Sequence, residues 1–324
     1  MNIIAHKTYH VKSQTTKIDC VAQKWQDKKI KSTKMARKMI RAGFEERGQR
    51  MMNCSTQLIY SKCIDCGDLR IKHATLCRDK LCPICSWRLS LQRFANMTKL
   101  MRHIMFTYPE YKYAFITLTV PNCEPSQLRQ TMKKMSAAWN RLTNRKAIKE
   151  CVAGWARSVE ITYNPHTRTC HPHYHIIAMV QSLSDAYEIQ MTWLQTNRMG
   201  AIDRAQMTEM IGVGSLEIDS SEMLSAVLET YKYSVKSKDL DTMPLKEFRE
   251  FVGNVNGMRM TSFGGILKEE KANLQLEFEE AEEGDEYRVC SRCGGNNVVD
   301  AICQWSFKDQ VYDRVLLSLD EATN

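Results

Sequence analysis

The most informative stretch of this chain reads His171-Pro172-His173-Tyr174-His175-Ile176-Ile177-Ala178-Met179-Val180. A short apolar run of this kind predicts a β-strand, and three histidines stand at its start. Successive side chains of a strand point to opposite faces, so His173 and His175 project from the same face. Two imidazoles at this spacing can hold one metal ion and leave coordination positions open for a substrate oxygen. The alternative is a strand that begins with partly exposed histidines.

A second predicted strand lies just upstream, where polar and apolar residues alternate over 157–163. Asn164-Pro165-His166 follows as a turn signal, so the two runs predict a β-hairpin. Glu160 falls on the polar face of its strand and is the candidate third metal ligand. Its carboxylate oxygen favours Mg²⁺ or Mn²⁺ over a closed zinc site. The alternative for Glu160 is a cross-strand ion pair with an Arg or Lys.

Residues 220–236 predict a helix with a serine cap and an early acidic residue. Its expected buried stripe comprises Leu224, Val227, Leu228 and Tyr231. Glu229, Tyr233 and Lys236 follow at four- and three-residue steps, so they would share a different face. A phenol there can attack a phosphodiester when metal and lysine stabilise its charged form, and the carboxylate can activate water or another nucleophile. The alternative for Tyr233 is a half-exposed aromatic.

Three ordered motifs carry a resemblance to a known family. They are Phe115-Ile116-Thr117-Leu118-Thr119-Val120, then His171-Pro172-His173-Tyr174-His175, then Glu229 with Lys232-Tyr233 and Lys236. The set resembles the rolling-circle replication initiators of plasmids, which belong to the HUH endonuclease superfamily. It is most similar to the plasmid replication protein family in which one nucleophilic tyrosine follows a glutamate by four residues.

The resemblance implies a role for each matching residue. His173 and His175 would bind a divalent metal ion, Mg²⁺ or Mn²⁺, and His171 fits the same motif. Tyr233 would nick one strand at the plasmid origin and remain attached to the 5′ phosphate. Glu229 would act in the terminating cleavage and Lys236 would position phosphate. The resemblance also implies plasmid origin DNA as partner, with host helicase and polymerase extending the free 3′ end.

A cysteine pattern elsewhere predicts structural zinc. Cys63-x-x-Cys66, fifteen further residues, and Cys82-Pro83-Ile84-Cys85 form a zinc-ribbon-like spacing that offers four thiolates to one ion. Cys77 and His73 lie between the pairs and are alternative ligands. Residues 77–88 also resemble the segment that precedes the catalytic domain in the replication family, although Leu89 stands where an arginine is more usual. Ordinary buried cysteines are the alternative.

Charge is concentrated at the amino terminus. The chain carries a net charge of +9, and residues 1–50 contain thirteen Lys and Arg against four Asp and Glu. This excess suits a phosphate-rich partner, and a solvated arm is the alternative. Residues 268–286 contain nine acidic residues against two lysines, which predicts an exposed helix or linker. Beyond them, Cys290, Cys293 and Cys303 are one ligand short of a second zinc site, for which Cys20 or Cys54 could supply the fourth.

The chain is predicted to be an α+β protein with a central antiparallel sheet, flanking helices and a preceding zinc-ribbon-like module. The expected segments are a basic N-terminal arm at 1–50, a zinc-binding module at 51–95, an HUH nicking and joining catalytic domain at 96–265, and an acidic linker with a C-terminal C-x-x-C at 266–324. Helices are expected at 91–105, 127–142 and 187–199, and a short strand at 215–219.

Cysteine usage and hydropathy predict a cytoplasmic bacterial protein. The chain has thirteen cysteines, and the sequence shows no signal peptide and no apolar stretch long enough to cross a bilayer. Two other functions fit part of the pattern. An HUH transposase would perform the same chemistry on a mobile element, and a non-catalytic zinc-dependent DNA-binding regulator would explain only the cysteines and the basic arm.

Overall fold

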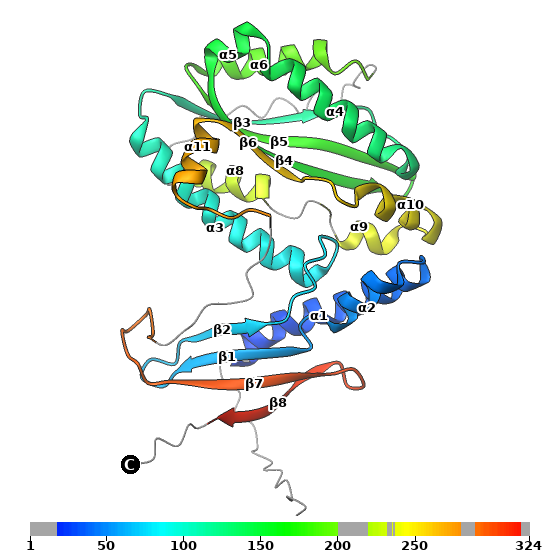
Figure 1. Ribbon diagram of the computed structural model, residues 1–324, viewed down its shortest axis with the longest axis vertical. Helices are drawn as coiled ribbons and strands as arrows, with labels where there is room; N and C mark the ends of the chain where they lie inside the picture. The colour runs from blue at the N-terminus through cyan, green and yellow to red at the C-terminus, as the bar shows by residue number, and fades with distance from the viewer. Residues whose placement is uncertain (1–17, 200–219, 232–234, 236, 280–288, 319–324) are drawn as a thin grey trace, which may run out of the picture. The chain divides into compact units, whose positions relative to one another are not determined.

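The computed structural model describes residues 18–199, 220–231, 235, 237–279 and 289–318 (Figure 1). The chain forms two compact units. One comprises the described residues within 1–30, 55–75 and 283–324, and the other those within 31–54 and 76–282. Helix α1 (Ile18–Arg41) runs through the boundary between these ranges.

The larger unit is built on a four-stranded antiparallel sheet in the order β3-β5-β4-β6. Its strands are β3 (Lys112–Thr119), β4 (Val152–Asn164), β5 (Thr169–Val180) and β6 (Thr261–Gly265). Strands β4 and β5 form the predicted hairpin. The Asn164 side chain accepts hydrogen bonds from the backbone N–H groups of His166 and Thr167, which fixes the turn. Strand β5 pairs with β3 along one edge and with β4 along the other, so it lies in the interior of the sheet.

One face of this sheet packs against α4 (Leu128–Thr143) and α6 (Leu183–Thr196), as Figure 1 shows. The Tyr174 ring contacts Trp139 of α4 and Trp193 of α6, with centroids 6.3 and 5.9 Å apart. The Trp193 indole N–H donates to the Thr119 carbonyl at 2.7 Å, which fixes α6 against the end of β3. Side chains from both layers thus bury the even-numbered positions of β5.

The opposite face packs against α3 (Pro83–Thr107), α8 (Ser221–Tyr231) and α11 (Ile266–Asn273). Ile177 and Met179 of β5 lie in this core with Met223 and Val227 of α8. The remaining helical elements of the unit are α2 (Glu45–Asn53), a 3₁₀ turn (Pro125–Gln127), α5 (Lys146–Cys151), α9 (Ser237–Thr242) and α10 (Leu245–Val255).

The smaller unit contains a second antiparallel sheet in the order β2-β1-β7-β8. Its strands are β1 (Gln57–Cys63), β2 (Leu69–Ala74), β7 (Val298–Ser306) and β8 (Val311–Ser318). Strand β1 pairs with β7 over its whole length, from Gln57 opposite Gln304 to Cys63 opposite Val298. A hairpin near the amino terminus is therefore completed by the carboxy-terminal part of the chain.

The predicted fold class is confirmed, because antiparallel sheets flanked by helices make up an α+β protein. The helix expected at 91–105 lies within α3, and the helix expected at 127–142 coincides with α4 to within one residue at each end. Helix α6 begins four residues before the helix expected to start at residue 187. The strand expected at 215–219 lies outside the described residues. Among the described helices, none is both long and apolar enough to cross a membrane.

The structure divides the chain differently from the four expected segments. Residues 18–41 form helix α1, with Trp25, Met35 and Met39 almost fully buried, so the basic arm is largely a packed amphipathic helix. After α11, Leu276 and Phe278 enter the core, and the Arg93 guanidinium donates to the Phe278 carbonyl at 2.6 Å. The excess of acidic residues in 268–286 predicted an exposed helix or linker and gave no indication that Leu276 and Phe278 would be buried.

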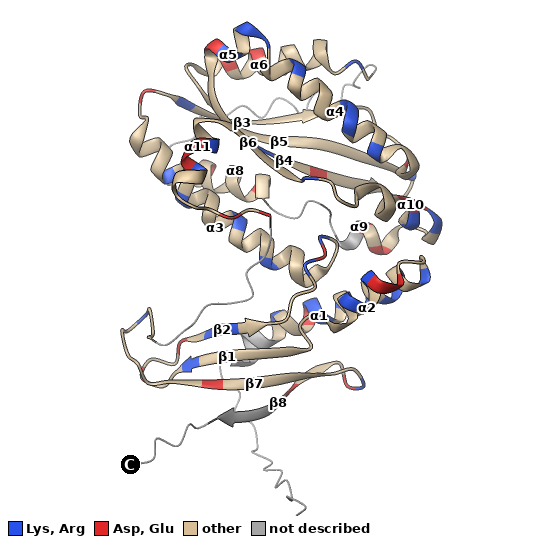
Figure 2. Cartoon of the chain, viewed as in Figure 1, with Lys and Arg blue, Asp and Glu red and all other residues tan. Residues whose placement is uncertain are grey.

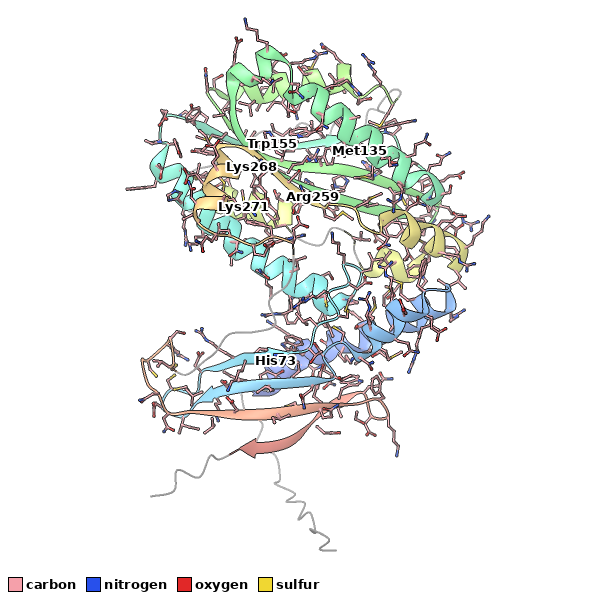
Figure 3. All side chains as sticks on the ribbon, in the orientation of Figure 1. His73, Met135, Trp155, Arg259, Lys268 and Lys271 are labelled. Atoms are coloured by element: carbon pink, nitrogen blue, oxygen red, sulfur yellow. The ribbon has the colours of Figure 1, made fainter. Side chains whose placement is uncertain are left out.

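Glycine at position 264 is required by the packing of β6 on β4. A Cβ atom there would lie 2.4 Å from Cε2 of Trp155, the β4 residue labelled in Figure 3. We expect Gly264→Val to destabilise the larger unit by about 1–3 kcal/mol because overpacked side chains must shift. The melting temperature should fall by roughly 2–10 °C in a thermal scan followed by circular dichroism.

Gly253→Ala is the matched control, since a Cβ atom at this position of α10 meets no described residue within 4 Å. The added methyl group should leave the melting temperature unchanged or raise it slightly, because alanine favours a helix more than glycine does. Equal melting temperatures for Gly264→Val and the unmodified protein would contradict the packing described.

Candidate metal and nucleophile site

The predicted ligands are brought together by the strand register. His173 of β5 lies between Thr119 of β3 and Glu160 of β4, and His175 lies between Thr117 and Ser158. Paired residues of antiparallel strands project from the same face, so these side chains form two adjacent rows. The rows occupy the same face as Ile177 and Met179, beyond the point where α3 and α8 cover the sheet.

Glu160, His173 and His175, which we call the His–Glu site, could hold a metal ion. Oε2 of Glu160 lies 3.0 Å from Nε2 of His175 and 3.4 Å from Nε2 of His173. Two ligand atoms about 2.1 Å from one ion lie about 3.0–3.4 Å apart, so these separations fit a shared ion. All three residues are buried, and their ligand atoms lie within 4.8 Å of one another.

Neighbouring groups orient both imidazoles. The Thr117 hydroxyl lies 3.2 Å from Nδ1 of His175, and Nδ1 of His173 lies 3.4 Å from the carbonyl of His171. Each Nδ1 is thereby engaged, which directs Nε2 toward Glu160, the usual arrangement around ligating histidines. Burial also lowers the pKa of His175 below its usual range, although hydrogen bonding to Glu160 opposes this effect. A neutral imidazole is the form that binds metal.

His171 lies next to the His–Glu site, with its ring centroid 5.2 Å from that of His173. Its Nε2 makes a short hydrogen bond with the Thr119 hydroxyl, so the structure places His171 beside the ligands and not among the three. Thr117 and Thr119 were not assigned roles from the sequence. Their alternation within the apolar run Phe115–Val120 was the available signal, because two hydroxyls on one face of a buried strand need polar partners.

Helix α8 brings Glu229 to the edge of the His–Glu site. Oε1 of Glu229 lies 3.8 Å from Nε2 of His175, and its side chain is 43% exposed. The predicted helix over 220–236 is wrong at its end, because α8 stops at Tyr231 and Val235 forms a parallel bridge with Ile161 of β4. Leu228 is exposed, in contrast to its expected burial. Tyr233 and Lys236 lie outside the described residues.

Four cysteines form the α3 cysteine cluster, which could hold a metal ion such as zinc: Cys54, Cys77, Cys82 and Cys85. Sulfur separations of 3.5 Å between Cys54 and Cys85 and 3.6 Å between Cys77 and Cys85 fit thiolates about 2.3 Å from one tetrahedral ion. Hydrogen bonds from the other three thiols lower the pKa of Cys54. Arg47 binds Asp79 through two hydrogen bonds and so steadies the loop between Cys77 and Cys82.

A second group, the knuckle cluster, comprises Cys63, Cys66, Cys290 and Cys293. It joins two loops of the same kind, because each reads C-x-x-C-G. The N–H of Gly67 donates to the Cys63 carbonyl, and the N–H of Gly294 donates to the Cys290 carbonyl. Both glycines have a positive φ, at 69° and 73°. Paired knuckles with the same turn are the construction of a zinc ribbon.

These clusters correct the predicted zinc ligands. Cys63 and Cys66 do not share a site with Cys82 and Cys85, because each pair is completed by other cysteines. His73 lies on β2 and belongs to neither cluster (Figure 3). Cys303 lies in β7 and is likewise in neither group. The spacing identified the two C-x-x-C pairs correctly but could not show that their partners come from residues 54, 77, 290 and 293.

Comparisons with known proteins agree with the motifs. A family model described as a replication protein matches residues 68–313. The chain belongs to the replication protein family. A protein rep of Streptococcus pneumoniae is 30% identical over 262 residues, which cover 78% of this chain and 80% of that protein. A protein rep of Lactiplantibacillus plantarum is 26% identical over 303 residues, covering 89% and 94% of the two chains.

The protein rep of Bacillus amyloliquefaciens is 28% identical over 296 residues, covering 82% of this chain and 85% of its own length. No solved structure matches the chain. The predicted resemblance and function class, a plasmid rolling-circle replication initiator, are thereby confirmed. The matched region includes the His–Glu site and Glu229, so the site lies within the part of the chain that the family model covers.

Two cysteine clusters predict two zinc ions per chain, whereas the sequence predicted one zinc site and left a second one ligand short. We expect elemental analysis of the purified protein to give about two zinc ions, and Cys290→Ser with Cys293→Ser to lower this to about one. Cys151→Ser is the control, because Cys151 belongs to neither cluster. A value of one zinc in the unmodified protein would rule out one of the two sites.

Thr117 and Ser158 flank His175 on either side, but only the Thr117 hydroxyl is hydrogen-bonded to its ring. We expect Thr117→Val to weaken Mn²⁺ binding by about 10–100-fold, the usual effect of removing a group that orients a ligand. Ser158→Ala should leave the affinity unchanged, since the Ser158 hydroxyl has no hydrogen-bond partner among the residues that the structure describes. Titration calorimetry with Mn²⁺ measures both, and similar losses in the two variants would contradict the orienting role.

Proposed function

We propose that this replication initiator is a nicking and joining enzyme that acts on one strand of plasmid origin DNA. The observation that carries the proposal is the His–Glu site with Glu229 at its edge. Two imidazoles and one carboxylate form a donor set that suits a divalent ion such as Mg²⁺ or Mn²⁺. With three protein ligands, coordination positions remain for a phosphate oxygen. A divalent ion bound there would polarise the phosphate and reduce the charge that develops on it.

The proposed nucleophile is Tyr233, carried over from the family motif. Its phenolic oxygen loses its proton and attacks phosphorus, and the bond from phosphorus to the 3′ oxygen breaks. The departing 3′ oxygen takes up a proton and becomes the 3′-hydroxyl. The 5′ end stays attached as a phosphotyrosine, which keeps the bond energy for rejoining. The residues on either side of the segment support this assignment, because Glu229 lies beside His175 and Val235 pairs with Ile161.

Tyr231 is unsuited to the same role. It is 1% exposed, packs against Phe278 with ring centroids 5.5 Å apart, and has a raised pKa because of its burial. A buried phenol with a raised pKa forms the nucleophilic phenolate less readily than an exposed one. The prediction that Tyr231 belongs to the core is confirmed.

Glu229 is the proposed base for the terminating cleavage, in which water or another nucleophile attacks a second phosphodiester. Its half-exposed carboxylate at the edge of the His–Glu site would accept the proton that this nucleophile loses. Lys236 is the proposed partner for phosphate charge, again from the family motif. The 3′-hydroxyl released by nicking would be extended by host polymerase behind a host helicase.

The proposed DNA substrate is an unpaired segment of the origin, such as a hairpin loop. A strand free of its partner lets a backbone phosphate approach a buried metal site. A transposase would use the same chemistry, but the family match favours a replication protein. A regulator without chemistry would leave the buried group of Glu160, His173 and His175 without a purpose. Both cysteine clusters are proposed to hold structural zinc.

Tyr233→Phe provides the direct test. Incubated with Mn²⁺ and single-stranded origin DNA, the unmodified protein should give a covalent protein–DNA adduct in a denaturing gel. Tyr233→Phe should abolish the adduct, because it removes the attacking oxygen. Tyr231→Phe is a matched control two residues away. It should retain the adduct, since the Tyr231 hydroxyl has no hydrogen-bond partner in the described part of the chain.

His175→Ala should lower the rate of adduct formation by a factor of at least about 100, because a lost ligand weakens metal binding by that order or more. An adduct that persists in Tyr233→Phe would refute the assigned nucleophile. DNA binding without an adduct in the unmodified protein would support the regulator instead.

A further inference from the structure

The second half of helix α1 presents one uniformly basic face. Within residues 31–41, the exposed positions are Lys31, Lys34, Arg37 and Arg41, and every one is a Lys or Arg. Lys38 is half-buried on the same side. Figure 2 shows Lys and Arg positions along α1 in blue. We call this set, Lys31, Lys34, Arg37, Lys38 and Arg41, the α1 basic face.

The other side of these turns is firmly packed. Met35, Ala36 and Met39 are at most 1% exposed. Ser32 contacts the α3 cysteine cluster, with its hydroxyl 3.3 Å from the sulfur of Cys82. The helix therefore holds its cations in fixed positions, and binding at this face would not require the chain to become ordered first.

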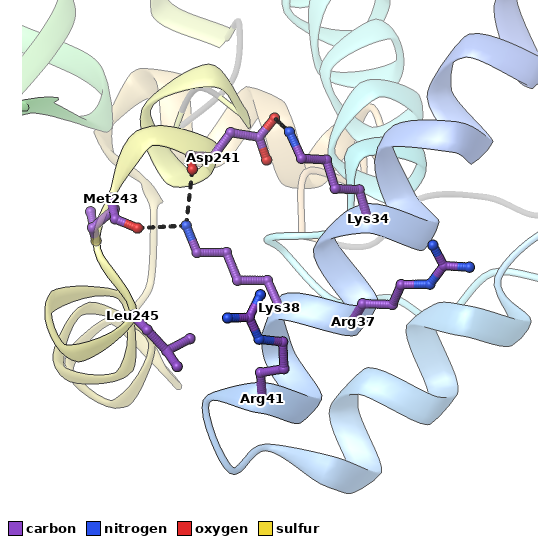
Figure 4. Close-up of a pocket in the computed structure, with 7 residues that line it drawn as sticks. All are labelled: Lys34, Arg37, Lys38, Arg41, Asp241, Met243 and Leu245. Atoms are coloured by element: carbon purple, nitrogen blue, oxygen red, sulfur yellow. Dashed lines mark hydrogen bonds and ion pairs between the residues drawn. The ribbon is translucent and has the colours of Figure 1, made fainter.

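A pocket separates the α1 basic face from α9 and the start of α10 (Figure 4). The Lys38 ammonium donates to the carbonyls of Asp241 and Met243, and Lys34 pairs with Asp241 at 3.3 Å. Asp241 is the one acidic residue among the 7 that line the pocket. Within the described parts of the chain, Lys31, Arg37 and Arg41 form no ion pair, so three cations remain available to a ligand.

We propose that the α1 basic face binds the phosphate backbone of duplex DNA next to the nick site. This inference rests on the proposed function, because it supplies the surface that holds the double-stranded part of the origin. Residues 31–41 span roughly 15 Å, a length over which one DNA strand presents about four phosphates. Cations three or four residues apart stand about 5–6 Å from one another, close enough to contact successive phosphates.

Two features favour duplex over single-stranded DNA. Residues 31–41 contain no aromatic side chain, whereas single-strand sites rely on aromatic rings that stack on bases. The position is also suitable, because α9, which Lys34 and Lys38 contact, begins two residues after Val235 and its bridge to Ile161. A duplex held at this face would lie one short helix from the segment that carries the proposed nucleophile.

The test is the triple variant Lys31→Gln, Arg37→Gln and Arg41→Gln, which leaves Lys34 and Lys38 and their contacts with α9 intact. The probes are a fluorescent duplex of about 20 base pairs, roughly two helical turns, and an oligothymidylate of the same length. Fluorescence anisotropy should show duplex affinity reduced on the order of 10–100-fold at about 0.15 M salt. The slope of log affinity against log salt should become shallower by about 2.7, as expected for three lost phosphate contacts.

The charge-matched control replaces Lys133, Lys134 and Lys149 with Gln, which removes the same charge from exposed positions on α4 and α5. This control should keep most of the duplex affinity. Equal losses in the two triple variants, or an unchanged duplex affinity in the α1 variant, would overturn the inference. An equal loss of oligothymidylate binding in the α1 variant would overturn the assignment to duplex DNA.

A failure of the proposed function would look different. Nicking is measured on single-stranded origin DNA, where the α1 variant should form the phosphotyrosyl adduct at the unmodified rate. If the unmodified protein forms no adduct, the proposed enzyme activity fails, while duplex binding can still be measured. The circular dichroism spectrum and melting temperature of the α1 variant should match those of the unmodified protein, because the three replaced side chains are exposed.

Discussion

The pairing of β5 with both of its neighbours is the constraint on which the rest of the site depends. The register of β5 with β4 places Glu160 opposite His173, and the register of β5 with β3 places Thr117 opposite His175. A shift of one residue in either pairing would turn the carboxylate or the hydroxyl to the other face of the sheet. Strand β5 is paired on both edges, so two ladders of hydrogen bonds hold this register.

The same face of β5 carries both the site and the core. Its histidines are followed by Ile177 and Met179, which pack under α3 and α8. Helix α8 also contributes to both the core and the site. Met223 and Val227 pack in the core, and the Glu229 carboxylate lies 3.8 Å from Nε2 of His175. The hydrophobic contacts that seat the helix therefore also set the position of the carboxylate. Burial of one large apolar side chain stabilises the folded state by about 1.5–3 kcal/mol, so moving α8 away from this core would be destabilising.

Local patterns predicted that Glu160, His173 and His175 would lie together, since all three lie within one hairpin and alternation alone places them on one face. Contacts between distant segments were beyond this reasoning. The helix over 220–236 was expected to continue because its spacing allowed it, but Val235 forms a parallel bridge with Ile161 of β4. The basic count of residues 1–50 likewise concealed the buried stripe of α1. One unused signal existed for zinc, because Cys66-Gly67 and Cys293-Gly294 end two matching C-x-x-C-G turns.

The two cysteine clusters differ in how far apart their cysteines lie along the chain. In the α3 cysteine cluster, Cys54 and Cys85 are 31 residues apart, so these cysteines can meet soon after this segment is made. In the knuckle cluster, Cys66 and Cys290 are 224 residues apart, and residues 76–282 of the larger unit lie between them. The entropy lost on closing a flexible loop grows with its length, so prior folding of the larger unit would shorten the effective loop. The sheet of the smaller unit should therefore be completed last, when β7 reaches β1 and the four knuckle cysteines come together.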